Sequence, residues 1–209
     1  MVVSNASDSI IVVSLDISDC GAVEELIDKA TMICSSVESS LSDPTPLLVI
    51  AARCGAMTAD VPHNVERLLT KADCLCLVQD ADNDRAAERV SGYFRRITTS
   101  AYMGIDEADI RLVLGGRVFM LEGTVYGGAG HLLTWAKECG LSEPIADCGR
   151  CLVSIEAGGS ITISEIDNIT TEIDMLTMGK AKYGVALTES KEDVDVIMMI
   201  PLDPLFRKV

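Results

Sequence analysis

Two pairs of aspartates are the residues of this chain whose type and spacing could do chemistry. Asp106 and Asp109 stand three residues apart in the stretch 104–111, which follows a helical pattern and leads into an apolar run. Carboxylates in the first turn of a helix accept hydrogen bonds from free backbone N–H groups and are favoured by the helix dipole. From the residues alone, this pair is therefore interpreted as a helix cap.

The second pair, Asp80 and Asp82, alternates in a polar loop directly after the apolar run 74–78. Alternating carboxylates at the end of a strand are ligands that Mg²⁺ accepts. Together with Asp16, which follows the first apolar run, they would suit a Mg²⁺-dependent phosphoryl-transfer or Toprim-like enzyme. Toprim chemistry requires a glutamate after the first strand, and the haloacid-dehalogenase phosphatases require Asp-x-Asp there, whereas the chain has Asp-Ile-Ser. The metal site is thus the alternative to a polar loop in which Asp82 or Asp84 caps the next helix.

The cysteines and histidines predict no further site. Cys148 and Cys151 have the C-x-x-C spacing of a metal or redox site, but zinc requires a second ligand pair and none stands at matching spacing. Cys74 and Cys76 alternate along an apolar run, so we expect small buried hydrophobes there. His131 begins a helical pattern without a Cys or Ser near it in sequence, and a nucleophilic triad is not predicted.

The charge balance limits the classes of partner that we expect this chain to bind. The formal net charge is −15, whereas binding to nucleic acid needs clustered Lys and Arg that release counterions. An anionic membrane surface is disfavoured for the same reason, and no apolar run reaches the roughly 18 residues needed to cross a bilayer. The stretch 1–9 is polar and lacks the basic region of a signal peptide. We expect a cytoplasmic protein with reduced cysteines and no nucleic-acid or membrane partner.

The secondary-structure pattern predicts an α/β fold. In the first half, continuous apolar runs alternate with helical periodicity, which is typical of a Rossmann-like parallel sheet with its ligands at the carboxyl ends of the strands. In the second half the elements are separated by Gly-rich turns, which favours an α+β arrangement. The expected strands are 9–15, 47–52, 74–78, 118–125, 151–155, 183–187 and 194–200, and the expected helices are 20–37, 65–69, 84–97, 129–139 and 163–175.

Four blocks in the second half resemble FtsZ, the prokaryotic relative of tubulin. The stretch 104–111 resembles "NVDFADVR" of that family, and the glycines of 123–130 are similar to its glycine-rich strand end and turn. The run 151–166 resembles the family's "LVNITGG-DLTLxEV", and the stretches 181–188 and 194–200 are similar to its closing strand pair. The blocks agree with the family in order and spacing.

The resemblance implies a fold, a domain division and a site. It implies a reduced Rossmann-like unit over residues 1–83, a connecting helix over 84–101 and an FtsZ-like α+β domain over 102–209. FtsZ is a GTPase that polymerises head to tail, and an acidic "synergy" loop of one subunit completes the active site of the next. By the resemblance, Asp106 and Asp109 are the acids of that loop that position and activate the attacking water, so this role stands beside the capping role.

The chain departs from the family where GTP should bind. FtsZ surrounds the phosphates with a glycine run, "GGGTGTG", whose backbone N–H groups face the ligand. The stretch 14–23 corresponds either to this loop, by its distance to the next strand, or to the family's first loop, because residues 20–23 resemble its "GCNAV". In both cases it carries Asp16 and Asp19, and carboxylates repel phosphates while side chains occupy space that only glycine leaves free. We therefore expect no GTP and no other cofactor, with Mg²⁺ only under the alternative. The loop itself has Gly104 and Glu107 where the family has Asn and Phe.

The expected function follows from a contrast between two surfaces of the chain. The surface that would reach a neighbour's nucleotide is retained, and the surface that would hold the chain's own nucleotide is lost. We expect a non-GTPase FtsZ-like protein that associates with itself or with an FtsZ filament in cell division or a related cytoskeletal process. Such a subunit would cap filaments, regulate their assembly or polymerise without nucleotide. A protein that kept only the fold is the remaining alternative.

Overall fold

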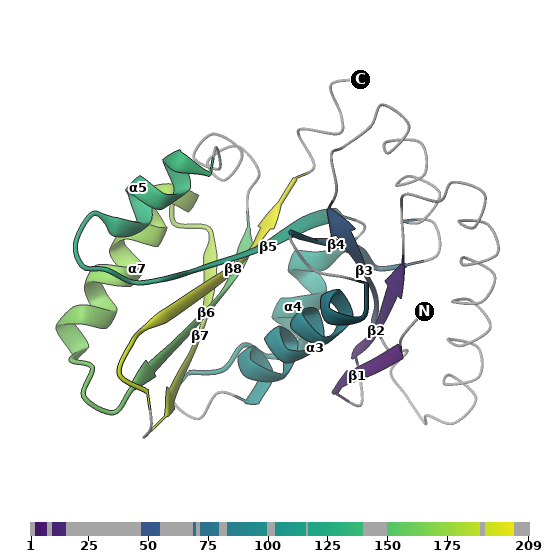
Figure 1. Ribbon diagram of the computed structural model, residues 1–209, viewed down its shortest axis with the longest axis horizontal. Helices are drawn as coiled ribbons and strands as arrows, with labels where there is room; N and C mark the ends of the chain where they lie inside the picture. Colours follow the sequence, from purple (N-terminus) through teal and green to yellow (C-terminus); the bar gives the residue numbers. More distant parts are fainter. Residues whose placement is uncertain are drawn as a thin grey trace. The chain divides into compact units, whose positions relative to one another are not determined.

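The computed structural model forms two compact units, and each is described by itself. The first unit comprises Met1–Arg95 and Leu114–Phe119, and the second comprises Arg96–Val113 and Met120–Val209. The residues described are 3–7, 10–15, 47–54, 69, 72–79, 83–99, 103–115, 117–139, 150–188 and 191–202. The division falls inside three elements, α3 (Asn83–Thr99), α4 (Glu107–Leu114) and β5 (Arg117–Val125), each of which contributes to both units (Figure 1).

Parallel strands form the sheet of the first unit. β2 (Ile10–Leu15), β3 (Leu47–Cys54) and β4 (Cys74–Gln79) pair in parallel in this order. Consecutive side chains along β3, such as Leu47, Leu48 and Val49, are buried, as expected of a parallel sheet with both faces covered. The three strands predicted from continuous apolar runs are therefore confirmed.

One strand of this unit was not predicted. β1 (Val3–Ser7) pairs antiparallel with β2 and ends the sheet. Its polar sequence has no apolar run, and an edge strand needs less apolar surface than a central one because it has a neighbour on one side only. The predicted helix 20–37, and the predicted helix 65–69 apart from Leu69, lie outside the described residues.

Helix α3 confirms the helix predicted over 84–97 and extends it slightly at both ends. Its periodic apolar side chains, Ala86, Ala87, Val90, Phe94 and Ile97, are each 0% exposed. Spacing of three and four residues places them on one helical face, so burial of this face stabilises the helix. The opposite face carries the exposed charges.

The sheet of the second unit has mixed pairing. β6 (Cys151–Gly158) pairs in parallel with β7 (Ala181–Thr188) and antiparallel with β8 (Asp195–Pro201). The second half of β5 runs close to β8, since a Cβ on Gly123 would lie 3.2 Å from Ile197 Cγ1. Mixed pairing is what an α+β unit requires. The predicted α/β class, with a parallel first part and an α+β second part, is confirmed.

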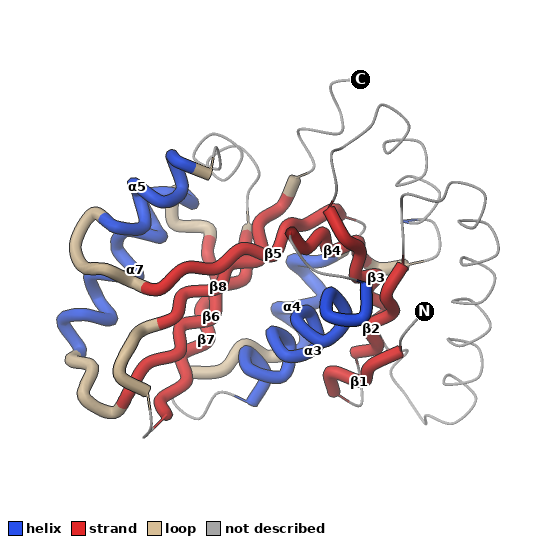
Figure 2. Tube along the Cα trace, in the orientation of Figure 1, coloured by secondary structure: helices blue, strands red, loops and turns tan. Residues whose placement is uncertain are grey.

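Two helices cover one face of these strands, as Figures 1 and 2 show. They are α5 (His131–Glu138) and α7 (Ile163–Thr177), close to the predicted 129–139 and 163–175. Between helices and sheet lies the core of the unit, built from alternate residues of the strands. Its buried members are Leu132, Ala136, Cys151, Val153, Ile155, Ile169, Ile173, Leu176, Val185, Val196, Met198 and Ile200.

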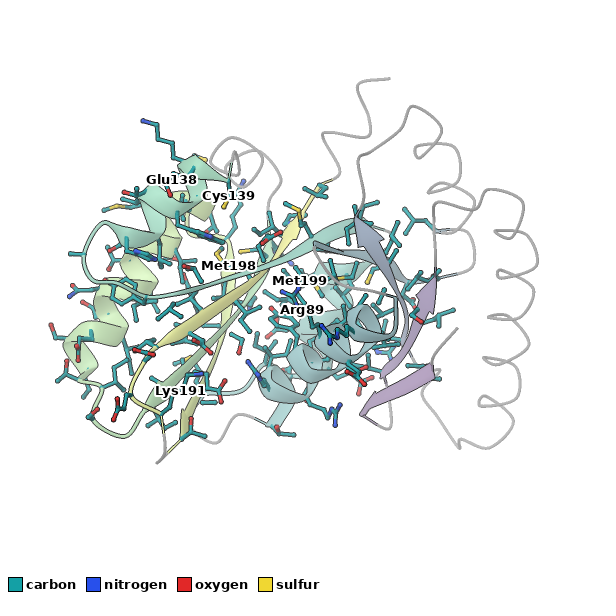
Figure 3. All side chains as sticks on the ribbon, viewed as in Figure 1. Arg89, Glu138, Cys139, Lys191, Met198 and Met199 are labelled. Atoms are coloured by element: carbon teal, nitrogen blue, oxygen red, sulfur yellow. The ribbon has the colours of Figure 1, made fainter. Side chains whose placement is uncertain are left out.

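The C-terminal turn of α3 is tied to this sheet by ion pairs. Arg96 lies 3.1 Å from the Glu156 carboxylate of β6, and Lys191, labelled in Figure 3, lies 3.4 Å from it. Lys191 also pairs with Asp195 at the start of β8. The same region is tightly packed, because a Cβ on Gly158 would meet the Lys191 carbonyl oxygen. Within the described residues, no helix is both long and apolar enough to cross a membrane.

A capping box begins α7. The Thr162 hydroxyl accepts from the Glu165 backbone N–H at 3.2 Å, and the Thr162 backbone N–H donates to the Glu165 carboxylate at 2.8 Å. These two bonds satisfy donors that a helix start otherwise leaves free. The backbone N–H of Thr162, and then its hydroxyl, hold the pKa of the Glu165 carboxyl below its usual value of 4.5.

We predict that Glu165→Ala lowers the melting temperature at neutral pH and lowers it less in acid, once the pH falls through the folded-state pKa of Glu165. The folded-state pKa of Glu165 is lowered, so its contribution is present above the unfolded pKa and is lost as the pH falls through the folded pKa. Thermal unfolding of the variant and of Glu192→Ala, an exposed carboxylate before β8, measures the effect. The same loss at both pH values, or the same loss in the control, would contradict the prediction.

Candidate functional site

The candidate site is the acidic loop, which we define as Met103–Asp109, between the end of α3 and the first turn of α4. Its backbone is held at two places. The Ile105 N–H donates to the Ile97 carbonyl of α3 at 2.9 Å, and Met103 forms an isolated antiparallel bridge with Val185 of β7, with bonds of 3.2 and 2.7 Å. The loop is thus attached to both α3 and β7.

Gly184 allows α3 to approach β7 at this point. A Cβ on Gly184 would lie 3.2 Å from Ile97 Cα and 3.4 Å from Ile97 Cβ. These distances are shorter than ordinary van der Waals contacts between carbons, so a side chain here would force α3 away from the strand. Since Ile97 also accepts the hydrogen bond of Ile105, its position helps to set that of the loop.

Asp106 caps α4. Its Oδ1 accepts from the Asp109 backbone N–H at 2.7 Å, and its carbonyl accepts from the Ile110 N–H at 3.1 Å. This is the N-cap geometry that the three-residue spacing predicts. The side chain remains exposed to solvent. The capping role of Asp106 is therefore confirmed, while a role of Asp106 and Asp109 toward a neighbouring subunit stays a prediction.

The other two carboxylates of the loop are ion-paired inside the second unit. Asp109 Oδ1 lies 3.0 Å from the Lys182 ammonium of β7. Glu107 accepts from Arg111, one turn further along α4, at 2.6 and 2.9 Å. Glu107 and Asp109 thus each have a counter-charge in the chain, whereas the partner of Asp106 is a backbone N–H.

Two large apolar side chains are exposed on the same segment. Met103 is 49% exposed and Leu112 is 60% exposed. Ala108, four residues before Leu112, is also exposed, and residues four apart share a face of a helix. The buried face of α4 is formed by Ile110, Val113 and Leu114.

A second polar cluster lies at the start of α5. Glu172, on the inner face of α7, is buried to 7% exposure and accepts from the backbone N–H of Gly130 at 2.6 Å and of Leu132 at 2.9 Å. The Tyr126 hydroxyl donates to the same carboxylate at 3.2 Å. Burial, and then the Glu172 charge, raise the pKa of Tyr126. This carboxylate occupies the anion-binding position of the α5 N-terminus, so the cluster is a link between α5 and α7.

His131 lies beside a hydroxyl that its neighbours in the sequence do not predict. Thr124 Oγ1 lies 3.2 Å from His131 Nε2, and the His131 ring packs on Gly127 and edge-on to Tyr126. A hydroxyl beside an imidazole is the first half of a nucleophilic site, whose other half is a group that orients the imidazole. The nearby carboxylate, Glu172, is instead engaged with the α5 N-terminus. No triad is assembled by the residues described here.

The remaining candidates divide between described and undescribed residues. Asp80 and Asp82 lie outside the described residues, as does Cys148. Cys74 and Cys76 are fully buried and free, which confirms them as buried apolar side chains. Burial raises the pKa of the Cys151 thiol to about 12, so it remains protonated and unreactive at neutral pH. No group of three metal-ligating side chains occurs within the described part of the chain.

Two residues that hold these clusters together were not identified from the sequence. They are Lys182, beside the acidic loop, and Glu172, at the start of α5. For Glu172 a signal exists, because it stands three residues after Ile169 and four before Leu176 on the apolar face of a helix. For Lys182 there is no such signal, since its partner Asp109 is far away in sequence and a lysine in a strand is commonplace.

Comparison with known proteins shows the fold. No protein-family model and no curated protein sequence matches the chain. Among solved structures it is similar to an empty FtsZ dimer from M. jannaschii, with a TM-score of 0.66 and 15% identity over 92% of this chain and 63% of that one. A CetZ from Methanosaeta thermophila gives a TM-score of 0.61 and 17% identity over 96% of this chain and 64% of that one.

A TubZ protofilament in its GTPγS form, from Bacillus thuringiensis serovar israelensis, gives a TM-score of 0.52 and 9% identity, with 83% of this chain and 57% of that one covered. The chain spans less than two thirds of the length of each of these proteins. The predicted resemblance to FtsZ is confirmed at the level of the fold, which is FtsZ-like.

We predict that Glu172→Ala lowers the free energy of unfolding by about 3 kcal/mol, because the buried N–H of Leu132 and the partly buried N–H of Gly130 lose a charged acceptor. Urea denaturation measures the loss, with Thr171→Ala, an exposed neighbour on α7, as the matched control. Glu172→Gln, which keeps one acceptor oxygen, should lose less. If Glu172→Ala and Thr171→Ala unfold alike, the carboxylate does not link the helices.

We also predict that Asp106→Ala lowers the free energy of unfolding by about 1 kcal/mol, whereas Asp106→Asn leaves it nearly unchanged. Asparagine keeps the oxygen that accepts from the Asp109 N–H and removes the charge. Chemical denaturation of both variants separates the cap from the charge. An equal loss in the two variants would show that the charge, and not the cap, stabilises the fold.

Proposed function

We propose that this chain is a non-GTPase protein of FtsZ-like fold that associates with a second copy of itself or with an FtsZ filament. The observation that carries the proposal is the exposure of Met103 and Leu112 on the acidic loop and α4. We call the surface formed by residues 103–112 the association face. Exposed apolar side chains between compensated charges are typical of surfaces that bind proteins.

Assemblies of similar proteins support this proposal. FtsZ from M. jannaschii has been solved as a dimer and TubZ as a protofilament, so the fold is compatible with self-association. The association face contains the stretch 104–111, whose sequence resembles the FtsZ loop that enters the neighbouring subunit. We propose that the retained loop keeps the contact with a neighbour, and that Asp106 and Asp109 reach any nucleotide that this neighbour holds.

The proposal includes the loss of GTP binding. By the resemblance, Asp16 and Asp19 stand in a stretch that replaces one of the two phosphate-side loops of the FtsZ family, and like charges at contact distance repel strongly away from bulk water. A subunit that can complete a neighbour's site but cannot hold a nucleotide would add to one filament end only. It would therefore act as a cap, as an assembly regulator or as the subunit of a nucleotide-independent polymer.

The proposed setting is the cytoplasm, in cell division or a related cytoskeletal process. The four cysteines that the structure describes, Cys74, Cys76, Cys139 and Cys151, are all free. Free thiols suit a reducing compartment. The acidic net charge of −15 makes separate copies repel one another, so association needs a specific contact.

We predict that Leu112→Asp weakens association at least about tenfold, because a charge replaces the most exposed large apolar side chain of the face. Sedimentation velocity of the chain alone, and co-sedimentation with FtsZ polymers, measure association. The matched control is Leu133→Asp, which adds the same charge at an exposed leucine of α5. If the two substitutions change association equally, the contact does not lie on the association face.

Calorimetric titration with GTP and with Mg²⁺ tests the nucleotide part of the proposal. Neither should bind. Tight GTP binding would overturn it, and Mg²⁺ binding that is lost in Asp80→Ala would support the phosphoryl-transfer enzyme instead. If neither the chain alone nor its mixture with FtsZ polymers shows association, the proposed function fails.

A further inference from the structure

Two exposed methionines lie at the C-terminal end of α7. Met175 is 65% exposed and Met178 is 67% exposed, and residues three apart share a face of a helix. Met178 is the C-cap of α7 and has a φ of 53°, in the left-handed region where glycine is the usual residue. Neither burial nor backbone conformation therefore explains a large apolar side chain at this position. A contact with another segment would explain it.

The exposed face of α7 beside these methionines is acidic. The helix has four acids and no lysine or arginine in 15 residues, whereas the chain has a net charge of −15 over 209 residues, so α7 is more than three times as acidic per residue. Asp174 and Asp167 are both exposed, one turn before Met178 and two turns before Met175. The nearest base in the sequence, Lys180, follows the helix. Apolar side chains bordered by carboxylates fit a partner that carries apolar groups and cations.

The chain itself contains a segment of this complementary chemistry. Residues 203–209 follow β8 and lie outside the described residues, and their sequence is Asp-Pro-Leu-Phe-Arg-Lys-Val. Leu205 and Phe206 supply the apolar groups, and Arg207 and Lys208 are adjacent bases in a chain that is otherwise strongly acidic. Aromatic rings also make favourable contacts with the sulfur of methionine.

The strand pairing of the second unit brings the start of this segment close to α7. β8 runs antiparallel to β6 and β7 runs parallel to it, so β8 ends, at Pro201, where β7 begins, at Ala181 (Figure 1). Both strands are neighbours of β6, which places these two ends about 10 Å apart. Met178 stands only three residues before Ala181. Seven extended residues span up to about 23 Å, which is enough to reach the last turns of α7.

We propose that the segment 203–209 docks on α7 of the same chain, with its apolar side chains over the two methionines and its two bases beside the carboxylates of the helix. The occupant is the chain's own segment because it combines the required chemistry with a short covalent connection. Closing a short loop costs less entropy than bringing two molecules together. This contact is separate from the association face and does not depend on the proposed function.

Limited oxidation of the dilute full chain with hydrogen peroxide, read by peptide mass spectrometry, tests the proposal. Met103, which is 49% exposed on the acidic loop, is the internal reference. If nothing covered them, Met175 and Met178 would oxidise at least as fast as Met103, because they are more exposed. With the segment docked, they should oxidise at least about threefold more slowly than Met103.

Variants of the segment identify what covers the methionines. Arg207→Glu combined with Lys208→Glu should remove the protection of Met175 and Met178, because the segment then repels the acidic helix. Phe206→Ser should also reduce it, since the apolar contact is lost. Arg207→Lys combined with Lys208→Arg is the matched control, and it should keep the protection because both charges remain.

A zero-length carbodiimide cross-link gives a second measurement. It joins an amine to a carboxylate only when the two groups are in contact, so Lys208 should couple to an acid of α7 within a single chain. Coupling should disappear in Phe206→Ser and persist in Arg207→Lys.

The other outcomes decide against the proposal. Oxidation of Met175 and Met178 as fast as that of Met103 in the unmodified chain overturns it. Protection that survives both the charge reversal and Phe206→Ser shows that something else covers α7. Protection that increases with protein concentration, or cross-links between two chains, overturns the choice of the same chain and assigns the contact to a second copy. Loss of protection in the charge-keeping control overturns the ionic part.

Discussion

The backbone bridge between Met103 and Val185 is the constraint on which the candidate site depends. It fixes the acidic loop to β7, and Gly184 beside it lets α3 approach closely enough for Ile97 to accept the hydrogen bond of Ile105. Because the backbone is fixed at these points, Asp106 lies at the start of α4 and caps it. Asp109 lies close enough to β7 to pair with Lys182. The position of the acidic loop thus depends on β7 and α3 as much as on the residues of the loop.

The interactions of the acidic loop differ in how much they stabilise its position. An N-cap contributes about 1 kcal/mol, whereas an exposed ion pair contributes typically about 0.2–1 kcal/mol. The cap by Asp106 and the backbone bonds of Met103 and Ile105 therefore define where the loop lies. The partly exposed pair of Lys182 and Asp109 adds little to stability, and its main effect is on the charge that the surface presents.

The sequence predicts those features that local patterns encode. Continuous apolar runs predict β2, β3 and β4, helical spacing predicts the buried face of α3, and the three-residue spacing of the aspartates predicts the cap of α4. Pairings between distant residues are not encoded locally. The bond of Glu172 to the start of α5, the approach of His131 to Thr124 and the pairing of Lys182 with Asp109 exist only once the helices and strands have assembled. β1 was missed because an edge strand needs no apolar run.

The arrangement of the carboxylates bears on whether the loop evolved for chemistry or for contact. A general base needs an oxygen that can take a proton from the substrate, and a metal site needs several oxygens that converge. Here Asp106 Oδ1 is engaged by a backbone N–H, Asp109 Oδ1 by an ammonium and Glu107 by a guanidinium. Each of these carboxylates thus already has an oxygen engaged by a partner within the chain. The same segment also exposes the large apolar side chains of Met103 and Leu112. An exposed apolar surface around ion-paired carboxylates favours contact with another protein over catalysis, and this is the physical basis of the proposed association.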